Sequence, residues 1–260
     1  MKVKILNKTD TEIKFLLEES NPQFANALRR IMMSEIPILA IEYVDFSVNS
    51  SVLYNELIAH RLGLIPLVFD SKKFHFKSKH DKDKTCSMCE VVFALNKKGP
   101  GMVYTKDMKS SNPDVKPLYD NIPIVELFDD QKLKLEASAS LGTGRDHARY
   151  QAALVSYRYF PTVKMSGKLA NVEDVVKVCP KHAIKVNGSK ADVDMNCDLC
   201  KECVRKADPE GSLEIAGDST KFIFNVESIS GLNPEEIVLQ AVNILKSKVK
   251  DFGKEVKKIK

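Results

Sequence analysis

The sequence predicts an α+β protein in which strands and helices occupy separate stretches of the chain. Two strand-then-helix patterns carry this prediction, one near the start of the chain and one at its end. Between them lie a β-rich stretch and a short segment, from Cys179 to Cys203, that holds four of the six cysteines. The length of 260 residues is compatible with one large domain or with two to three small ones.

Composition limits the class of protein. The chain has 260 residues, 43% of them hydrophobic and 29% charged, with a formal net charge of +5. These values are typical of a soluble globular protein. No run approaches the roughly 18 apolar residues of a membrane span, and the N-terminus lacks the apolar stretch of a signal peptide. We therefore expect a cytoplasmic protein that does not contact a membrane. The small positive charge permits contact with nucleic acid but does not demand it, so we expect no direct sequence-specific DNA binding.

The first strand-then-helix pattern lies in residues 11–37. Between Thr11 and Leu17, apolar and charged residues alternate as in a half-buried strand. Ser20-Asn21-Pro22 supplies residues that favour a helix start. The helix itself is indicated by apolar residues at spacings of three and four: Phe24, Ala27, Leu28 and Ile31. Pro37 ends this region.

The following stretch is predicted to be a β-rich insert domain over residues 40–168. Residues 38–52 are rich in strand formers, and residues 55–61 have a short helical pattern. Residues 71–84 and 97–117 are predicted to be loops on either side of a strand at 90–95.

The cysteine spacing predicts an iron-sulfur cluster. Cys197, Cys200 and Cys203 follow a Cys-x2-Cys-x2-Cys pattern, and Cys179 precedes a proline, as remote cluster ligands do in ferredoxins. Three cysteines at i, i+3 and i+6 suit a cubane better than zinc, which prefers separated pairs. We expect one [4Fe-4S] cluster on these four thiolates, with a [3Fe-4S] form if one iron is lost. A zinc site and free buried thiols are the alternatives.

The segment around these cysteines is too poor in large apolar residues to form a strong core by itself. A cluster would cross-link it, and we favour this structural role over electron transfer. A regulatory response to oxygen is a further hypothesis, motivated by the oxidisable thiolates.

A second cysteine pair is less informative. Cys86 and Cys89 could be half of a zinc site, a disulfide or two unrelated thiols, and His75 and His80 lie at a spacing that would complete a zinc site. Because these histidines fall in a charged loop, we expect no stable metal there.

The C-terminal pattern predicts a long helix with an apolar seam. A strand at 221–226 is followed by Asn233-Pro234-Glu235-Glu236, which favours a helix start. The seam follows a heptad pattern for about three repeats and consists of Val238, Val242, Leu245, Val249, Phe252 and Val256. The alternative is a helix buried in its own domain. Because Ile237, Ala241 and Ile244 widen the stripe, we expect it to face both its own domain and a partner helix.

No catalytic residues are predicted. Gly142-Thr143-Gly144-Arg145 is too short for a dinucleotide-binding motif. Asp192 and Asp194 are too few for a two-metal site. His147 has no neighbour at a fixed spacing that would activate it.

Four stretches of the sequence resemble the signatures of one family, the alpha-type assembly subunits of RNA polymerase. That family includes the bacterial alpha N-terminal domain, the eukaryotic third-largest subunit and their archaeal counterpart. The resembling stretches are residues 26–41 (NALRRIMMSEIPILAI), 60–67 (HRLGLIPL), 142–151 (GTGRDHARYQ) and 232–241 (LNPEEIVLQA). The match spans nearly the whole chain, and a ferredoxin-like insert marks the archaeal type within the family.

The resemblance implies a discontinuous dimerisation domain, residues 1–39 and 221–260, interrupted by the β-rich insert and by a ferredoxin-like cluster domain at 169–220. It implies activity only as part of DNA-directed RNA polymerase. The implied partners are the small subunit L, the two large catalytic subunits and small zinc-bearing subunits. Subunit L would contact the C-terminal seam together with Phe24, Leu28 and Ile31, and the stretch 142–151 would face the catalytic subunits. Eukaryotic relatives carry further cysteines beside the positions of Cys86 and Cys89, and this chain does not, so zinc is not expected there.

Two other functions compete with assembly. A ferredoxin-like module could deliver electrons while the rest of the chain acts as a docking domain, or the chain could be an independent nucleic-acid-binding iron-sulfur protein. The alpha-type motifs favour the assembly function.

Overall fold

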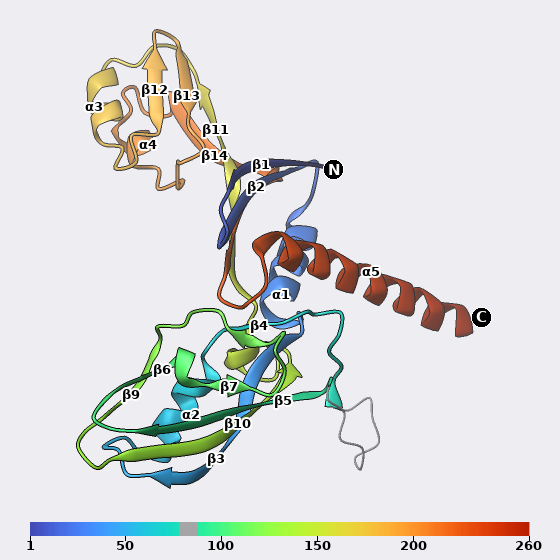
Figure 1. The fold of residues 1–260 in the computed structure, drawn as a ribbon. Helices are drawn as coiled ribbons and strands as arrows, with labels where there is room; N and C mark the ends of the chain where they lie inside the picture. Colours follow the sequence, from blue (N-terminus) through green and yellow to red (C-terminus); the bar gives the residue numbers. More distant parts are fainter. Residues whose placement is uncertain (78–87, 260) are drawn as a thin grey trace. The chain divides into compact units, whose positions relative to one another are not determined.

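The computed structural model describes residues 1–77 and 88–259. The chain divides into two compact units, each assembled from separate stretches of sequence. Unit 1 comprises Met1–Lys8, Ile13–Ala27 and Ser156–Asn225, and unit 2 comprises Thr9–Glu12, Leu28–Val155 and Val226–Lys260. Figure 1 follows the chain through both. The structure is a mixture of helices and β-sheets, as the sequence predicts.

Unit 1 is built on a four-stranded sheet in the order β1-β2-β14-β11. Its strands are β1 (Lys2–Lys8), β2 (Glu12–Glu18), β11 (Ala153–Met165) and β14 (Leu213–Ser228). One face of this sheet carries an aromatic cluster. Phe15 stacks on Phe224 with ring centroids 5.0 Å apart, and Tyr157 lies 5.4 Å from Phe224. These contacts explain the alternation in the sequence of β2, because successive side chains of a strand point to opposite faces and Phe15 points into this cluster.

The cysteine-rich segment forms a small lobe of unit 1 at one end of β11 and β14 (Figure 1). It contains α3 (Val172–Lys177), α4 (Glu202–Lys206) and an antiparallel hairpin of β12 (Ile184–Asn187) and β13 (Lys190–Val193). The ends of the long strands supply part of its core, through Val163 and Met165 of β11 and Leu213 and Ile215 of β14. The lobe therefore shares its core with the strands that carry it.

Unit 2 contains a second four-stranded sheet, in the order β3-β10-β5-β7. The strands are β3 (Ile38–Asn49), β10 (Lys132–Gly142), β5 (Glu90–Lys98) and β7 (Lys109–Ser110), paired antiparallel. Helix α2 (Asn55–Gly63) buries Ile58 and Leu62 and packs near β3. Shorter elements complete the unit: β4 (Leu67–Val68), β6 (Gly101–Tyr104), η2 (Thr105–Asp107), β8 (Lys116–Pro117), β9 (Pro123–Leu127) and η3 (Ala148–Tyr150).

Two further helices begin where the sequence predicts. Helix α1 (Pro22–Ser34) starts after Asn21, whose Oδ1 accepts a hydrogen bond from the backbone N–H of Phe24 at 2.8 Å. Helix α5 (Pro234–Lys258) has proline in its first turn, followed by Glu235 and Glu236. Carboxylates at this end interact favourably with the helix dipole. No helix among the described residues is long and apolar enough to span a membrane.

The structure corrects the prediction of a loop over residues 97–117, because β6, η2, β7 and β8 lie within or at the end of that stretch. Strand β1 was not predicted, and β11 was predicted only as part of the β-rich stretch at 40–168. The predicted domain boundaries, 1–39 with 221–260, 40–168 and 169–220, do not coincide with the two compact units, and the last boundary cuts through β14. The predicted domain division remains a prediction.

Candidate functional site

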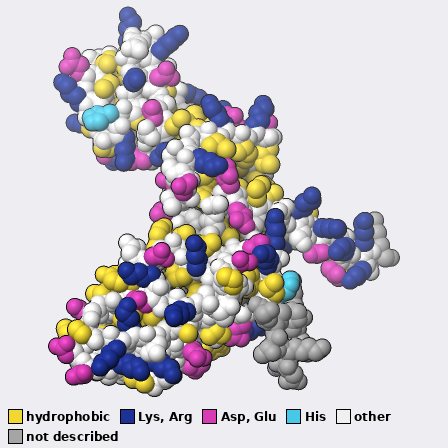
Figure 2. All heavy atoms as spheres, in the orientation of Figure 1, with side chains coloured by type: hydrophobic (Ala, Val, Ile, Leu, Met, Phe, Trp, Pro, Cys, Tyr) yellow, Lys and Arg dark blue, Asp and Glu magenta, His cyan; other side chains and the backbone are white. Residues whose placement is uncertain are grey.

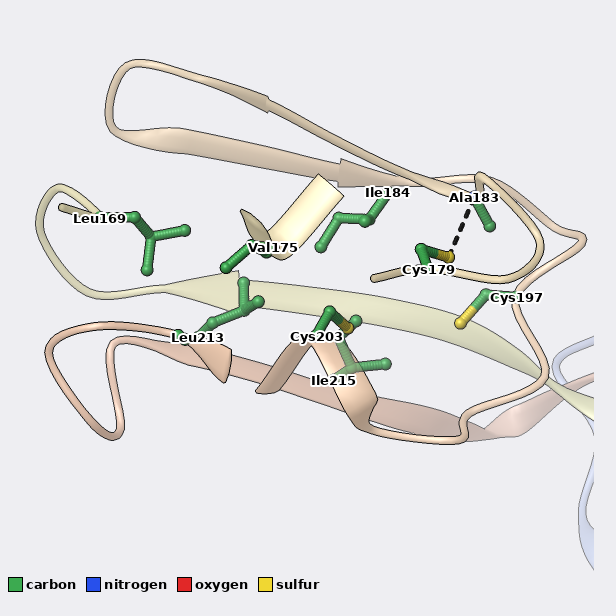
Figure 3. Close-up of a cluster of buried hydrophobic side chains, with 10 residues drawn as sticks. Leu169, Val175, Cys179, Ala183, Ile184, Cys197, Cys203, Leu213 and Ile215 are labelled. Carbon is green, nitrogen blue, oxygen red and sulfur yellow. Dashed lines mark hydrogen bonds between the residues drawn. The ribbon is translucent and has the colours of Figure 1, made fainter. Parts of the chain in front are cut away.

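The four predicted cluster cysteines all lie in the lobe of unit 1. Cys179 follows α3, Cys197 and Cys200 lie in the loop after β13, and Cys203 lies in α4. Three of them are buried, at 8% exposure for Cys179 and Cys197 and 5% for Cys203, whereas Cys200 is exposed. Figure 3 shows the three buried side chains reaching the same hydrophobic cluster from three segments of the lobe. The fold thus gathers cysteines that lie in separate segments of the sequence.

A backbone amide donates a hydrogen bond to one of the three buried sulfurs. The N–H of Ala183 donates to the Sγ of Cys179 at 3.3 Å (Figure 3). The backbone N–H of Leu199 lowers the pKa of Cys197, and that of Val204 lowers the pKa of Cys203, although burial outweighs both effects. Amide donors directed at cysteine sulfurs favour the thiolate form and help to set the potential of iron-sulfur centres.

Several residues next to the cysteines have left-handed backbone conformations. Leu199 and Lys201 have φ values of +61° and +62°, and each lies inside one of the two Cys-x2-Cys steps. His182, with φ +48°, lies between Cys179 and the amide that hydrogen-bonds its sulfur. Non-glycine residues rarely adopt this conformation, and it is concentrated at functional sites. Its recurrence in this lobe indicates that the backbone is shaped around the sulfurs.

The pKa values of two of the buried thiols are raised by burial and by the neighbouring cysteines. Burial raises the pKa of the Cys197 thiol, and negative charge on Cys179 and Cys200 raises it further. Burial likewise raises the pKa of the Cys203 thiol, again reinforced by charge on the other three cysteines. Four thiols that repel one another as thiolates would be stabilised in that form by a cationic iron centre.

The four cysteines are the residue type that binds iron-sulfur clusters. Among the described residues, no three His, Cys, Asp or Glu side chains converge closely enough to bind one metal ion. A cubane spreads its ligands further, because each thiolate binds a different iron. The two aspartates that precede this loop, Asp192 and Asp194, are too few for a two-metal site. Asp192 lies in β13, and the carboxylate of Asp194 accepts a hydrogen bond from the N–H of Asn196 at 2.7 Å.

The second cysteine pair is only partly visible. Cys86 and His80 lie outside the described residues. Cys89 is buried just before β5, and the N–H of His75 donates to the carbonyl of Met88 at 3.0 Å. The prediction of no stable metal at this pair remains a prediction.

The apolar seam of α5 is largely uncovered within the described part of the chain. Val242, Val249, Phe252 and Val256 are exposed, Phe252 to 72%, whereas Val238 and Leu245 are half-buried. By contrast, Ile237 and Ala241 are fully buried. The helix therefore faces its own unit through its first two turns, and its later turns leave the seam open. Figure 2 shows Lys and Arg side chains along this outer half.

The residues of α1 that were predicted to join this seam behave differently. Leu28 and Ile31 are buried within the chain, at 3% and 4% exposure, and Phe24 is half-buried. Their burial leaves Leu28 and Ile31 little surface to offer a partner, so this part of the predicted contact is not supported. Glu35, just beyond the helix, instead pairs with Lys248 of α5 at 2.5 Å.

The stretch 142–151 forms a tightly packed loop in unit 2. A Cβ on Gly144 would lie 2.4 Å from the carbonyl oxygen of Met33, and the N–H of Arg145 donates to the carbonyl of Ser34 at 2.9 Å. Arg149 donates from one guanidinium nitrogen to the carbonyls of Ile41 and Glu42, at 3.0 and 3.2 Å. This loop is therefore held against the end of α1 and against β3.

Two side chains of this loop, one exposed and one buried, make hydrogen bonds that stabilise it. The Nδ1 of His147 accepts from the N–H and the Nε of Arg149, at 3.1 and 3.2 Å, and His147 remains exposed. Tyr150 is buried beside Ser140, whose hydroxyl also donates to Glu42 at 2.5 Å. Burial raises the pKa of Tyr150, and the Glu42 carboxylate adds to this. Sequence reasoning missed this network, because its members are far apart along the chain and have no characteristic spacing.

Comparison with known proteins first defines the class. Residues 44–160 match the family model described as the RNA polymerase Rpb3/RpoA insert domain. This range begins within β3 and ends within β11, so it covers most of the sheet of unit 2 and most of the predicted β-rich insert.

Full-length relatives define the family. The chain is 38% identical to the DNA-directed RNA polymerase subunit Rpo3 of Methanothermobacter thermautotrophicus, over 95% of this chain and 96% of that protein. It is 36% identical to the Rpo3 of Archaeoglobus fulgidus, over 99% and 98%, and 37% identical to that of Pyrococcus horikoshii, over 100% and 99%. The chain belongs to the family of archaeal DNA-directed RNA polymerase subunit Rpo3, which confirms the alpha-type resemblance.

Proposed function

We propose that this chain is a non-catalytic assembly subunit of DNA-dependent RNA polymerase. It pairs with the small subunit L and docks the two large catalytic subunits and the small zinc-bearing subunits. The observation that carries this proposal is the open seam on α5, in a member of the Rpo3 family. Val249 and Phe252 are 64% and 72% exposed there. Exposed apolar surface of this kind marks a binding site for another protein.

The geometry of α5 supports pairing through a helix. The seam repeats at the heptad spacing, which keeps one apolar face turned toward a partner helix. Burial of Ile237 and Ala241 anchors the first turns, so the outer half is presented on a fixed base. An α5 paired in this way would bury the seam that the chain leaves open.

The loop at 142–151 supports docking of the catalytic subunits. Its backbone is fixed by Arg149, while Arg145, Asp146 and His147 remain exposed. The carboxylate of Asp146 accepts from the hydroxyl and the N–H of Thr143, at 2.7 and 3.1 Å, which lowers its pKa. A pre-organised loop with exposed polar side chains needs little ordering when it binds.

The lobe is proposed to hold one [4Fe-4S] cluster on Cys179, Cys197, Cys200 and Cys203. Bound iron would supply covalent links between α3, the loop after β13 and α4. The sulfurs of this chain would hold it, and the backbone N–H of Ala183 donates to the Sγ of Cys179. The core of the lobe has few large side chains, and three of its buried members are the cysteines themselves. The cluster is therefore proposed to stabilise the lobe, as metal binding does in other small domains.

The rival function is electron transfer by the ferredoxin-like lobe. It has the exposed Cys200 in its favour, because an accessible edge of a cluster can exchange electrons. The open seam and the family relationship favour assembly instead. A cluster that undergoes reversible reduction by a redox partner of the same cells would support the rival.

A tagged copy expressed in its own cells tests the assembly function. We expect mass spectrometry of the native complex to find the two large polymerase subunits and a small partner. Recovery of oxidoreductases without polymerase subunits would contradict the proposal and favour electron transfer.

A copy carrying Cys→Ser at all four ligands tests the cluster separately. We expect a poorly folded lobe, and normal folding and assembly would contradict the structural role of the cluster.

A further inference from the structure

The sheet of unit 1 carries a pocket lined mainly by residues that point away from its aromatic cluster, and Tyr157 belongs to both. The pocket has a volume of about 340 Å³ and is lined by Lys14, Ser156, Tyr157, Arg158, Ile223 and Asn225. These residues come from β2, β11 and β14, which are neighbours in the sheet. The assembly proposal makes no use of them.

Strand alternation explains why polar residues gather there. Phe15, Tyr157 and Phe224 pack together on one face. Successive side chains of a strand point to opposite faces, so Lys14, Arg158 and Asn225 lie on the other. Ile223 is 2% exposed and forms an apolar base among these polar groups.

The pocket is positively charged without a counter-ion of its own. Lys14 and Arg158 line it, and no carboxylate does. Arg158 donates to the carbonyl of Met195 at 2.8 Å, which is a neutral acceptor. Lys14 has no ion pair in the part of the chain that the structure describes.

A second pocket on the same two long strands shows the contrast. It has a volume of about 270 Å³ and is lined by Thr162, Lys164, Glu214, Ala216, Gly217, Asp218 and Ser219. Its one lysine is accompanied by two carboxylates, so an anion would be repelled there. Because the second pocket is similar in size to the first but has the opposite net charge, it serves as an internal control.

We propose that the first pocket binds one oxyanion, a carboxylate or a phosphate. The ammonium of Lys14 supplies a point charge, and the guanidinium of Arg158 keeps N–H groups beyond the one that Met195 accepts. Ser156 and Asn225 add a hydroxyl and an amide that can donate hydrogen bonds. Charge-assisted hydrogen bonds from several directions are the usual means of holding such a group.

Isothermal titration calorimetry on the full chain at low ionic strength tests the proposal. The probes are inorganic phosphate and an acetylated, amidated Glu-Glu dipeptide, each alone and in competition. We expect binding that weakens roughly tenfold in Lys14→Gln, since one charge-assisted hydrogen bond is lost. The matched variant Lys164→Gln, in the second pocket, should bind as the wild type does.

The two probes distinguish the source of the anion. Tighter binding of the dipeptide, with displacement of phosphate, would assign the pocket to an acidic side chain of another polypeptide. Binding of phosphate alone would assign it to a free or ligand-borne phosphate. The proposal is overturned if neither probe binds, if Lys14→Gln binds as well as the wild type, or if Lys164→Gln weakens binding equally. Ser156→Ala, expected to weaken binding to a smaller extent, checks the result at a residue that bears no charge.

Discussion

The backbone N–H of Ala183 lies 3.3 Å from the Sγ of Cys179, close enough to donate a hydrogen bond to it. The two residues are four positions apart in sequence, and His182, with φ +48°, turns the chain so that this amide faces back toward the sulfur. The backbone of the lobe therefore supplies a hydrogen-bond donor to one of the four proposed cluster ligands.

The first prediction concerns the cluster. Cys203→Ser should abolish stoichiometric iron and sulfide in protein purified without oxygen, because one of four ligands is lost. Cys89→Ser removes another buried cysteine, outside the lobe, and should leave the iron content at about four atoms per chain. Iron and acid-labile sulfide analysis with visible absorption spectra provides the measurement. Equal iron loss in both variants, or iron retained in Cys203→Ser, would contradict the assignment.

The second prediction concerns the α5 seam. Phe252→Asp should prevent recovery of the small partner with the tagged chain, because it places a charge in a face that pairing would bury. Asn243→Asp introduces the same charge away from the seam and should assemble normally. Quantitative co-purification followed by mass spectrometry compares the two. Loss of the partner in both variants would point to a general effect of charge instead of a seam.

The third prediction concerns the loop at 142–151. A Cβ on Gly144 would meet the carbonyl oxygen of Met33 at 2.4 Å, so Gly144→Ala should destabilise unit 2 by roughly 1–3 kcal/mol. Gly253→Ala in α5 meets nothing within 4 Å and should raise helix stability by about 0.5–1 kcal/mol. Urea unfolding of the two variants measures the difference. A neutral Gly144→Ala would mean that the loop is not held against Met33.

The fourth prediction concerns pH. Asp107 accepts from Lys97 at 2.6 Å and from the N–H of Tyr104 at 2.9 Å. Partial burial favours the protonated form, but these bonds and the charges of Lys97 and Lys106 outweigh it and hold the pKa of Asp107 below its ordinary value of 3.8. A lowered pKa in the folded state means that the carboxylate stabilises the fold above pH 3.8. That contribution is lost as the pH falls through the folded-state pKa.

Asp107→Asn should therefore lower the free energy of unfolding by about 1 kcal/mol near pH 7. The difference from the wild type should shrink below pH 3.8. Asp130→Asn changes a carboxylate that is 97% exposed and lies 3.8 Å from Lys98, and it should have no measurable effect. Urea unfolding across this pH range provides the measurement. A difference that grows as the pH falls would contradict the sign of the shift.

Much of the local structure follows from the sequence because its cause is local. The alternation around Phe15 predicts β2, and the Asn21-Pro22 pair predicts the start of α1, since a side-chain oxygen there can accept from Phe24. The cysteine spacing likewise identifies Cys179, Cys197, Cys200 and Cys203 as candidate ligands, because the Cys-x2-Cys-x2-Cys pattern and the Cys-Pro pair can be read directly from the sequence.

Other features depend on residues that meet only in three dimensions. The sequence predicts a β-rich stretch around β11 but not its pairing with β14, which brings Arg158 and Lys14 to the same pocket. The Glu42–Ser140–Tyr150 network likewise joins β3, β10 and η3, and no residue spacing in the sequence predicts it.

The sequence by itself therefore determined the family, the four candidate cluster cysteines and the apolar seam, since each is written in short motifs or in a helical repeat. Only the tertiary structure decided which apolar residues are available to a partner. Leu28 and Ile31 are covered by the chain, whereas Val249 and Phe252 are not. The physical reason is that burial depends on what packs against a residue, and the elements that do so come from distant parts of the chain.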